Sequence, residues 1–448
     1  MSSTRISAVP SLLVVPLLSA LCLFSSACVD EPRPPPQVGD NPGGGGPGTP
    51  GEPGPGGNAD GGLVLASDGG TLAAKPSCPG GSTSCQGACS DGGIVCLGNC
   101  GFLPPVRYPL GGEQADLAVG DLQGDGTDDL VTADTQGHVL HVLLNRGRGL
   151  FQTPSQWRAS TPSSVALARL DANASLDVLV ANSGSSSLGV YRGRGNGSFE
   201  PSITASSGSS LRGLVAWESN GSRHVAVTRG DTNEVSVYPV NGDGSLGTVA
   251  SYKALSSLHD LVVADFNGDE RPDIAGTYVN TCLSDADVAC QAVGVFLGKS
   301  DGTFEPPRIT PTGGTPLGLV AARLDPDALM DLIVADSHRH QVLVLSGRAD
   351  GSFFVQASYP TVRSPARLAL VDINRDTVPD LVVGSLGNEV GVMLGQPGGS
   401  FAAHVPLTAS TQEAGIRALA ASDFDKDGIN DVAVLTSSGV QMLWGICR

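Results

Sequence analysis

A nine-residue acidic loop recurs along this 448-residue chain and limits what the chain can fold into. The loop lies between short apolar runs and carries oxygen-bearing side chains at its first, third, fifth and ninth positions. Four copies are complete, at 121–129, 265–273, 372–380 and 423–431. Ca²⁺ takes about six to eight oxygen ligands, and a tightly curled loop with alternating carboxylates supplies them. The pattern predicts a cation site in each complete copy.

The loop is part of a longer unit that occurs seven times. The loops of units one to seven begin at Asp121, Arg169, Glu218, Asp265, Arg323, Asp372 and Asp423. Their spacing is roughly 48 residues, with one longer step that contains an insertion, and this period is typical of propeller blades. Each unit reads as four short strands, with a Gly-rich hairpin and a Phe before the fourth. The chain is therefore predicted to be all-β, with a seven-bladed β-propeller of four-stranded blades over residues 101–448.

The ring is predicted to close with residues from both ends of this region. The last unit stops before its hairpin and fourth strand, and the segment from Phe102 to Tyr108 reads like the missing piece. We expect that segment to supply the outer strand of the seventh blade. The same alignment places Cys100 and Cys447 within about two residues of each other, and a disulfide there would stabilise the ring by about 2–5 kcal/mol. A second expected disulfide, Cys282–Cys290, closes the insertion.

The first 77 residues are predicted to lie outside the fold. Residues 1–27 have a basic residue, an apolar run and then small residues, which is typical of a secretory signal and too short for a membrane span. The sequence around Cys28 resembles a bacterial lipobox, which implies acylation of Cys28, although Ser25 stands where Leu is usual. Cleavage after Ala27 without acylation is the alternative. Residues 28–77 are rich in Pro and Gly and predict a disordered tether.

A Cys-rich segment over residues 78–100 is predicted to form a small disulfide knot. Its cysteines are Cys78, Cys85, Cys89, Cys96 and Cys100. Export favours disulfides. A Zn²⁺ site is the less favoured alternative, because the segment lacks His and the paired CxxC motifs of zinc ribbons. Without Cys22 and Cys28 the chain has eight cysteines, an even number that fits four bridges. The pairing of the first four stays open.

The formal net charge of −18 is concentrated in the repeated loops. Cations are therefore the natural partners, and a nucleic-acid partner is not expected, because the chain has no basic stripe and would repel phosphate. Contact with a membrane is expected only through the lipid anchor.

The unit resembles the FG-GAP/VCBS-type repeat of bacterial surface proteins, which is related to the propeller of integrin α subunits. The resemblance covers about residues 101–448, and it implies that the loops join the two inner strands and bind Ca²⁺ on one face of the ring. The implied side-chain ligands are Asp121, Gln123, Asp125 and Asp129; Asp265, Asn267, Asp269 and Asp273; Asp372, Asn374, Asp376 and Asp380; and Asp423, Asp425, Asp427 and Asp431. Main-chain carbonyls of Thr127, Arg271, Val378 and Ile429 would complete about four structural sites.

Three units depart from this pattern. Arg169 and Arg323 replace the first Asp, and their guanidinium groups are expected to neutralise the remaining carboxylates in place of calcium. The loop of unit three, from Glu218 to His224, is shortened and is not expected to bind metal. Gln123 makes the first complete site the weakest, because its amide is neutral and longer.

The predicted role is binding or adhesion without catalysis, by an exported protein held by lipid at the outer membrane or cell surface, or else secreted. The ligand is an unknown protein or glycan. Repeated copies differ from the single differentiated constellation that an enzyme needs. The alternatives are a polysaccharide-active lyase or hydrolase and a structural part of an envelope complex. Candidate contact sites are the insertion at Thr277–Gln291, the aromatic residues Trp217 and Tyr278 and the central channel, whereas the Arg229-Gly230-Asp231 turn is interpreted as a chance tripeptide rather than an integrin-binding site.

Overall fold

The computed structural model describes residues 95–97, 100–278, 291–407 and 415–447. The predicted signal peptide, Cys28, the tether, most of the Cys-rich knot and the expected Cys282–Cys290 bridge lie outside the described residues.

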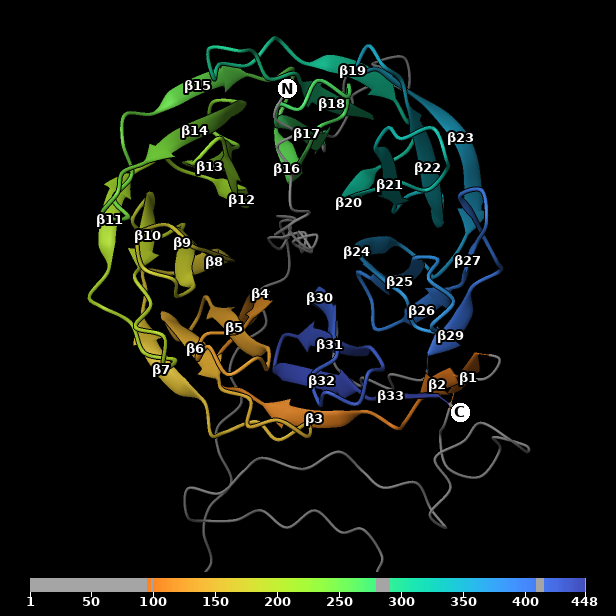
Figure 1. Ribbon diagram of the computed structural model, residues 1–448, viewed down its shortest axis with the longest axis horizontal. Helices are drawn as coiled ribbons and strands as arrows, with labels where there is room; N and C mark the ends of the chain where they lie inside the picture. Colours follow the sequence, from red (N-terminus) through yellow and green to blue (C-terminus); the bar gives the residue numbers. More distant parts are fainter. Residues whose placement is uncertain (1–94, 98–99, 279–290, 408–414, 448) are drawn as a thin grey trace, which may run out of the picture.

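Seven antiparallel four-stranded sheets are arranged radially around a centre, with the first strand of each sheet innermost (Figure 1). The predicted seven-bladed β-propeller is confirmed. Each blade has the sheet order first, second, third and fourth strand, from the centre outwards. We number the blades one to seven in the order of their loops. All secondary structure in the described residues is β-strand.

The innermost strands are β4 (Gln114–Gly120), β8 (Pro162–Ala168), β12 (Leu211–Ser219), β16 (Leu258–Ala264), β20 (Pro316–Ala322), β24 (Pro365–Val371) and β30 (Ile416–Ser422). The second strands are β5 (Asp129–Asp134), β9 (Asp177–Asn182), β13 (Ser222–Arg229), β17 (Asp273–Tyr278), β21 (Asp331–Asp336), β25 (Asp380–Ser385) and β31 (Asp431–Thr436). The third strands are β6 (Val139–Leu143), β10 (Ser187–Tyr191), β14 (Glu234–Val240), β18 (Ala292–Phe296), β22 (Gln341–Gly347), β26 (Val390–Met393) and β32 (Gly439–Leu443). The outer strands are β7 (Ser155–Arg158), β11 (Ile203–Ser206), β15 (Ala250–Lys253), β19 (Arg308–Pro311), β23 (Phe353–Pro360), β29 (Val405–Leu407) and β3 (Val106–Pro109).

The described ends of the chain meet in the seventh blade. Its outer strand is β3, which pairs with β32 (Figure 1). A separate three-stranded sheet contains β1 (Val95–Leu97), β2 (Cys100–Phe102) and β33 (Gly445–Cys447). The predicted outer strand, Phe102 to Tyr108, is therefore correct in its second half only, because Phe102 pairs with β33 instead. The predicted Cys100–Cys447 disulfide is present, between directly opposed residues of β2 and β33.

The hydrophobic core consists of seven clusters, one between each pair of neighbouring blades. Side chains of a strand alternate between the two faces of its sheet, and here both faces meet another blade. Near-continuous apolar runs, such as Leu332 to Ala335 in β21, are fully buried for this reason. Leu97 and Phe102 extend the cluster between blades six and seven, so the added sheet packs onto the ring.

A β-bulge interrupts the pairing of the first and second strands near the start of every innermost strand. The third residue of the innermost strand lies at this bulge and differs between blades, and the residues in order are Asp116, Ser164, Gly213, Asp260, Gly318, Arg367 and Ala418. Bulges redirect side chains locally. No helix among the described residues is long and apolar enough to cross a membrane.

Candidate metal centre and adjoining pocket

The first Asp of each complete loop holds the loop in its curled form. Asp423 accepts hydrogen bonds from the backbone N–H of Asp427 and of Gly428, both at 3.0 Å. Asp372 accepts from the corresponding two amides at 3.2 and 2.9 Å. Positive φ angles at the fourth and sixth loop positions turn these amides inwards, even where the residues are Lys426 or Arg375 rather than Gly. The four complete loops share this curled conformation because each has an Asp at its first position to accept these hydrogen bonds.

The last Asp of each loop ties the loop to the third strand. Asp431 accepts hydrogen bonds from the N–H of Phe424 at 3.0 Å and of Gly445 at 2.7 Å. Asp177, in a loop that was not expected to bind metal, makes the same two bonds, with Leu170 and Gly193 at 2.7 Å. These carboxylates are buried in blades one, two, four, five, six and seven. The ninth position therefore has a structural role that is independent of any cation.

Burial raises the pKa of five of these ninth-position carboxyls, which are Asp129, Asp177, Asp273, Asp331 and Asp380. The pKa of Asp129 rises to about 7 and that of Asp273 to about 6, because burial disfavours the charged form more than the two backbone amides favour it. A cation next to such a carboxylate would favour its ionised form.

The loop of unit seven brings three carboxylates together. Asp423, Asp425 and Asp431 each have one carboxylate oxygen within 4.8 Å of the other two. Among the described residues, no other set of three acidic, His or Cys side chains comes this close together. Asp427, the fourth expected side-chain ligand, lies outside this group and accepts the N–H of Ile429 at 2.9 Å. The donor set is all oxygen and three times negative, which suits a hard divalent cation.

The other complete loops hold their third position differently. In unit one, the Gln123 amide nitrogen donates to Asp129 at 3.2 Å and to the Asn145 carbonyl at 3.0 Å. In units four and six, Asn267 and Asn374 donate to the carboxylate at the fifth position, at 2.8 and 2.9 Å. In these three loops the amide nitrogen faces a carboxylate. The amide group would have to rotate before its oxygen could bind a cation.

The loop of unit three is shortened as expected, whereas neither Arg169 nor Arg323 forms an ion pair with the remaining carboxylates of its loop among the described residues. The unit three loop is a two-residue hairpin turn, Asn220-Gly221, between directly paired strands, and both residues have the positive φ of a type I′ turn. In unit two, Arg169 donates from Nε to the Ala174 carbonyl at 2.9 Å. The guanidinium of Arg169 therefore fastens the end of its own loop through a backbone contact.

Each loop is also fixed by the neighbouring blade. The second loop residue is apolar and buried in units one, two, four, six and seven, and Phe424 packs edge-on against Phe151 of blade one with ring centroids 6.0 Å apart. Phe266 packs in the same way against Phe353 of blade five at 5.6 Å. The Asn430 amide donates to the Asp372 carbonyl of the preceding loop at 2.7 Å. The loops are therefore parts of the interfaces between blades.

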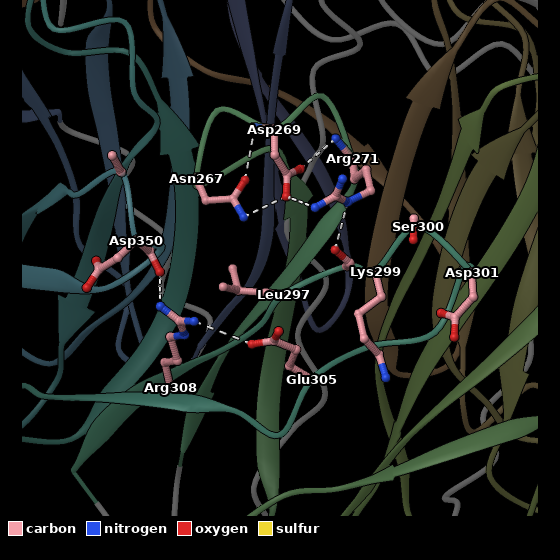
Figure 2. A pocket seen from close by; sticks show the side chains of 12 residues that line it. Asn267, Asp269, Arg271, Leu297, Lys299, Ser300, Asp301, Glu305, Arg308 and Asp350 are labelled. Carbon is pink, nitrogen blue, oxygen red and sulfur yellow. Dashed lines mark hydrogen bonds and ion pairs between the residues drawn. The ribbon is translucent and has the colours of Figure 1, made fainter.

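A polar pocket of about 460 Å³ lies beside the loop of unit four (Figure 2). It is formed by the third, fifth and seventh residues of that loop, by the hairpin of blade four and by the hairpin of blade five. Leu297 contributes an apolar side chain, and most other lining residues are charged or polar. Thr303 donates to Asp301 and, together with the nearby Lys299, lowers the pKa of that carboxyl.

The other candidate contact residues are occupied within the fold. Tyr278 was expected to be available to a glycan, but it is fully buried between blades three and four, since β17 packs on both faces. Trp217 stacks on His224 with centroids 5.3 Å apart. Arg229 of the Arg-Gly-Asp turn pairs with Asp231 at 3.5 Å and with Glu234 at 3.3 Å. This turn is therefore held by its own side chains.

A charged group near the centre of the ring was missed by sequence reasoning. Asp116, Asp260 and Arg367 are the third residues of the innermost strands of blades one, four and six, and the charge of Arg367 interacts with both carboxylates. Burial raises the pKa of Asp116 to about 8 and lowers that of Arg367 to about 9. Their separation along the chain conceals this proximity, and the only signal is a charged residue at a position where other units have a small one.

The repeats can now be compared with known proteins. A family model described as FG-GAP-like repeat matches residues 324–383 and 372–434, which contain the loops of units six and seven. Residues 324–434 of the seven-bladed β-propeller therefore consist of FG-GAP-like repeats. A comparison with curated proteins finds no match to the chain.

Several solved structures share the propeller fold. BBS1N in complex with ARL6DN, soaked with mercury, has 14% sequence identity and a TM-score of 0.53, and the match covers 76% of this chain and 94% of that chain. The same complex soaked with lead gives 13% identity and a TM-score of 0.51 with the same coverage. A lectin from Agrocybe aegerita that recognises non-reducing terminal N-acetylglucosamine gives 16% identity, a TM-score of 0.44 and coverage of 73% and 86%. At these identities the likeness concerns the fold alone.

Proposed function

We propose that the FG-GAP propeller is a calcium-stabilised binding module. The convergence of Asp423, Asp425 and Asp431 in the loop of unit seven carries this proposal. Three carboxylates held close together repel one another, and a divalent cation would relieve that repulsion. Asp423, Asp425 and Asp431 would hold the ion together with the main-chain carbonyl of Ile429.

Calcium would stabilise the ring because it binds the folded loop and not the unfolded chain. At a free concentration of 100 times Kd, such binding adds about 2.7 kcal/mol to the free energy of unfolding. The loop of unit seven is bonded to blade one through the Phe424 carbonyl, which accepts from the Asn145 amide at 2.7 Å. An ion there would therefore strengthen the interface between the first and last blades.

A binding role on the loop face is supported by the pocket beside unit four. Its lining combines acidic and basic side chains with the apolar side chain of Leu297, an arrangement suited to holding a polar ligand by several hydrogen bonds. Hydrogen bonds from Thr303 and Ser352 lower the pKa values of Asp301 and Asp350. These two carboxyls would stay ionised at neutral pH, which suits binding better than proton donation.

Thermal unfolding with and without calcium tests this proposal. The melting temperature of the purified protein should rise by about 5 °C between EGTA and about 10 mM CaCl₂, which exceeds the Kd range of extracellular calcium modules. Asp425→Asn should remove part of the rise. Asp325→Asn, at the same loop position in unit five where Arg323 replaces the first Asp, is the matched control and should not. An unchanged melting temperature together with no bound calcium would overturn the proposal.

We also propose that the module is exported and lipid-anchored through Cys28, with residues 29–77 as a tether. The basic, apolar and small-residue order before Cys28 supports this location. Expression in a bacterial host, followed by mass spectrometry of the N-terminal peptide, should find acylated Cys28 in the membrane fraction. Cys28→Ser should move the protein to the soluble exported fraction. An unmodified Cys28 in a soluble wild-type protein would favour simple secretion.

A further inference from the structure

The loop of unit four contains a cation of its own. The guanidinium of Arg271 forms an ion pair with Asp269, two residues earlier in the same loop (Figure 2). Its Nε donates to the Gly298 carbonyl at 3.0 Å, and the backbone N–H of Arg271 donates to the other oxygen of Asp269, also at 3.0 Å. Asp269 is thus engaged through both carboxylate oxygens, and one of its partners is positively charged.

This arrangement is specific to unit four. The seventh residue in the other complete loops is Thr127, Val378 or Ile429, and none of these carries a charge. Those loops therefore have no cationic side chain at the seventh position that could form an ion pair with the carboxylate at the fifth position. Without rearrangement, therefore, the residues of the unit four loop fit a divalent cation less well than those of unit seven.

Arg271 also lines the polar pocket. Its side chain lies between the loop and the pocket, and Lys299 and Arg308 contribute the two other cationic groups (Figure 2). Arg308 is already engaged with Glu305 at 3.4 Å and with the Asp350 carbonyl. A change in the side-chain conformation of Arg271 could therefore move its guanidinium from Asp269 in the loop to a ligand in the pocket.

We propose that Arg271 competes with a divalent cation for Asp269, so that metal binding at the 265–273 loop releases the guanidinium into the pocket to bind a carboxylate ligand. The inference rests on the proposed calcium binding. Three cationic and four acidic side chains line the pocket. Once Asp269 is given to a divalent cation, three acidic groups remain opposite three cationic ones, and Arg271 has lost its carboxylate. The metal-bound state therefore favours an acidic ligand more than the metal-free state does.

The competition has a measurable size. Side chains of Arg271 and Asp269 are 41% and 23% exposed, so water screens their ion pair. Replacing Arg271 by a neutral residue should tighten calcium binding at this loop by about fivefold, the upper range for an exposed ion pair. Asp269→Asn should remove binding at this loop in both backgrounds.

Calorimetric titration of the purified protein with CaCl₂ tests the first step. The variants are Arg271→Gln, Asp269→Asn and the matched control Arg375→Gln, which removes a positive charge from the unit six loop. Arg375 forms no ion pair within the described residues, so its removal reports only the general change in charge. We expect one site to tighten in Arg271→Gln beyond any change in Arg375→Gln. Equal affinities in wild type and Arg271→Gln, with calcium still bound at other loops, would overturn this inference alone. No calcium binding at all would overturn the proposed function as well.

Binding of D-glucuronate, followed by ligand-observed NMR, tests the second step. The probe should bind wild type in calcium and bind several-fold more weakly in EGTA, and glucose, which lacks the carboxylate, should show no such difference. Arg271→Gln should abolish the calcium dependence. Glucuronate binding that is equal in calcium and EGTA would overturn the release of Arg271 into the pocket, and so would equal binding of glucose and glucuronate.

Discussion

Gly445 pairs with Phe102 across the point where the two ends of the ring meet, at the register position where Gly395 pairs with Phe401 in the preceding blade. The same Gly–Phe pairing occurs at Gly298 and Phe304 in blade four. In those two blades a hairpin turn joins the Gly and the Phe. In blade seven the described chain has no such turn, and the Cys100–Cys447 disulfide joins β2 to β33 two residue pairs away from the Phe102–Gly445 pair. The covalent bridge thus takes the place of a turn.

Removal of this bridge should destabilise the ring substantially. The disulfide spans 347 residues, so the unfolded chain of a Cys100→Ala/Cys447→Ala variant gains much conformational freedom. We expect a loss of about 2–5 kcal/mol in the free energy of unfolding. Denaturant titration of the double variant and of wild type measures this difference. Coincident unfolding curves would show that pairing of β2 with β33 suffices to hold the ends together.

The ninth-position carboxylates should separate a structural contribution from a metal contribution. Asp177→Asn in unit two removes an acceptor for one of two buried amides and should cost about 1–3 kcal/mol equally in calcium and in EGTA. Asp431→Asn should cost a similar amount in EGTA and clearly more in calcium, because it also removes an expected ligand. Thermal unfolding of both variants under both conditions provides the comparison. Identical calcium effects in the two variants would contradict a metal role for Asp431.

Close packing of the loop against the third strand should make Gly298 irreplaceable. A Cβ at Gly298 would lie 2.3 Å from the Pro272 carbonyl oxygen, a contact that only backbone movement can relieve. Gly298→Ala should therefore destabilise by about 1–3 kcal/mol. Gly111→Ala is the control, because a Cβ there would meet nothing within 4 Å. Equal stabilities of the two variants would show that the loop shifts without cost.

Asp116 should make stability depend on pH above neutrality. Its carboxylate accepts from Leu117, Ser164 and Val165, yet burial raises its pKa to about 8. Because the folded pKa lies above the unfolded value, proton binding stabilises the folded state; this contribution is complete below the unfolded pKa and is lost progressively as the pH rises to and through 8. Between pH 7 and pH 9 the free energy of unfolding should fall by about 1.4 kcal/mol.

Asp116→Asn should remove this part of the pH dependence. If calcium binds as proposed, measurements in excess calcium should keep the loop carboxylates ionised, so that the change reports the centre of the ring. Denaturant titrations at pH 7 and pH 9 are sufficient. A pH dependence as steep in Asp116→Asn as in wild type would place the titrating group elsewhere.

The sequence predicts the repeated part of this molecule well because repetition is a local signal. The spacing of the loops leads to seven blades, the shortened unit three is a two-residue turn, and the alignment of hairpins places Cys100 beside Cys447. The calcium sites stay a prediction.

Features that depend on one blade meeting another are not visible in the sequence. The outer strand of blade seven begins at Val106 rather than Phe102, because Phe102 is needed opposite Gly445. Tyr278 is buried because another blade covers its face of the sheet. The seventh loop position is read from sequence as a carbonyl ligand, but only side-chain geometry shows that the guanidinium of Arg271 reaches Asp269.

The outer strand of blade seven also sets the order in which the ring can be completed. Strand β3 is made near the start of the propeller, and its partner β32 is made near the end. During synthesis the edge of β3 must therefore wait for almost the whole propeller before it can pair. Within each of blades one to six, the four strands come from one continuous stretch of the chain, so each of these sheets can pair as it emerges. Ring closure is the one step that joins distant segments, and such long-range pairing is slow. The unpaired edge of β3 is then the point at which an incomplete ring is most exposed to aggregation.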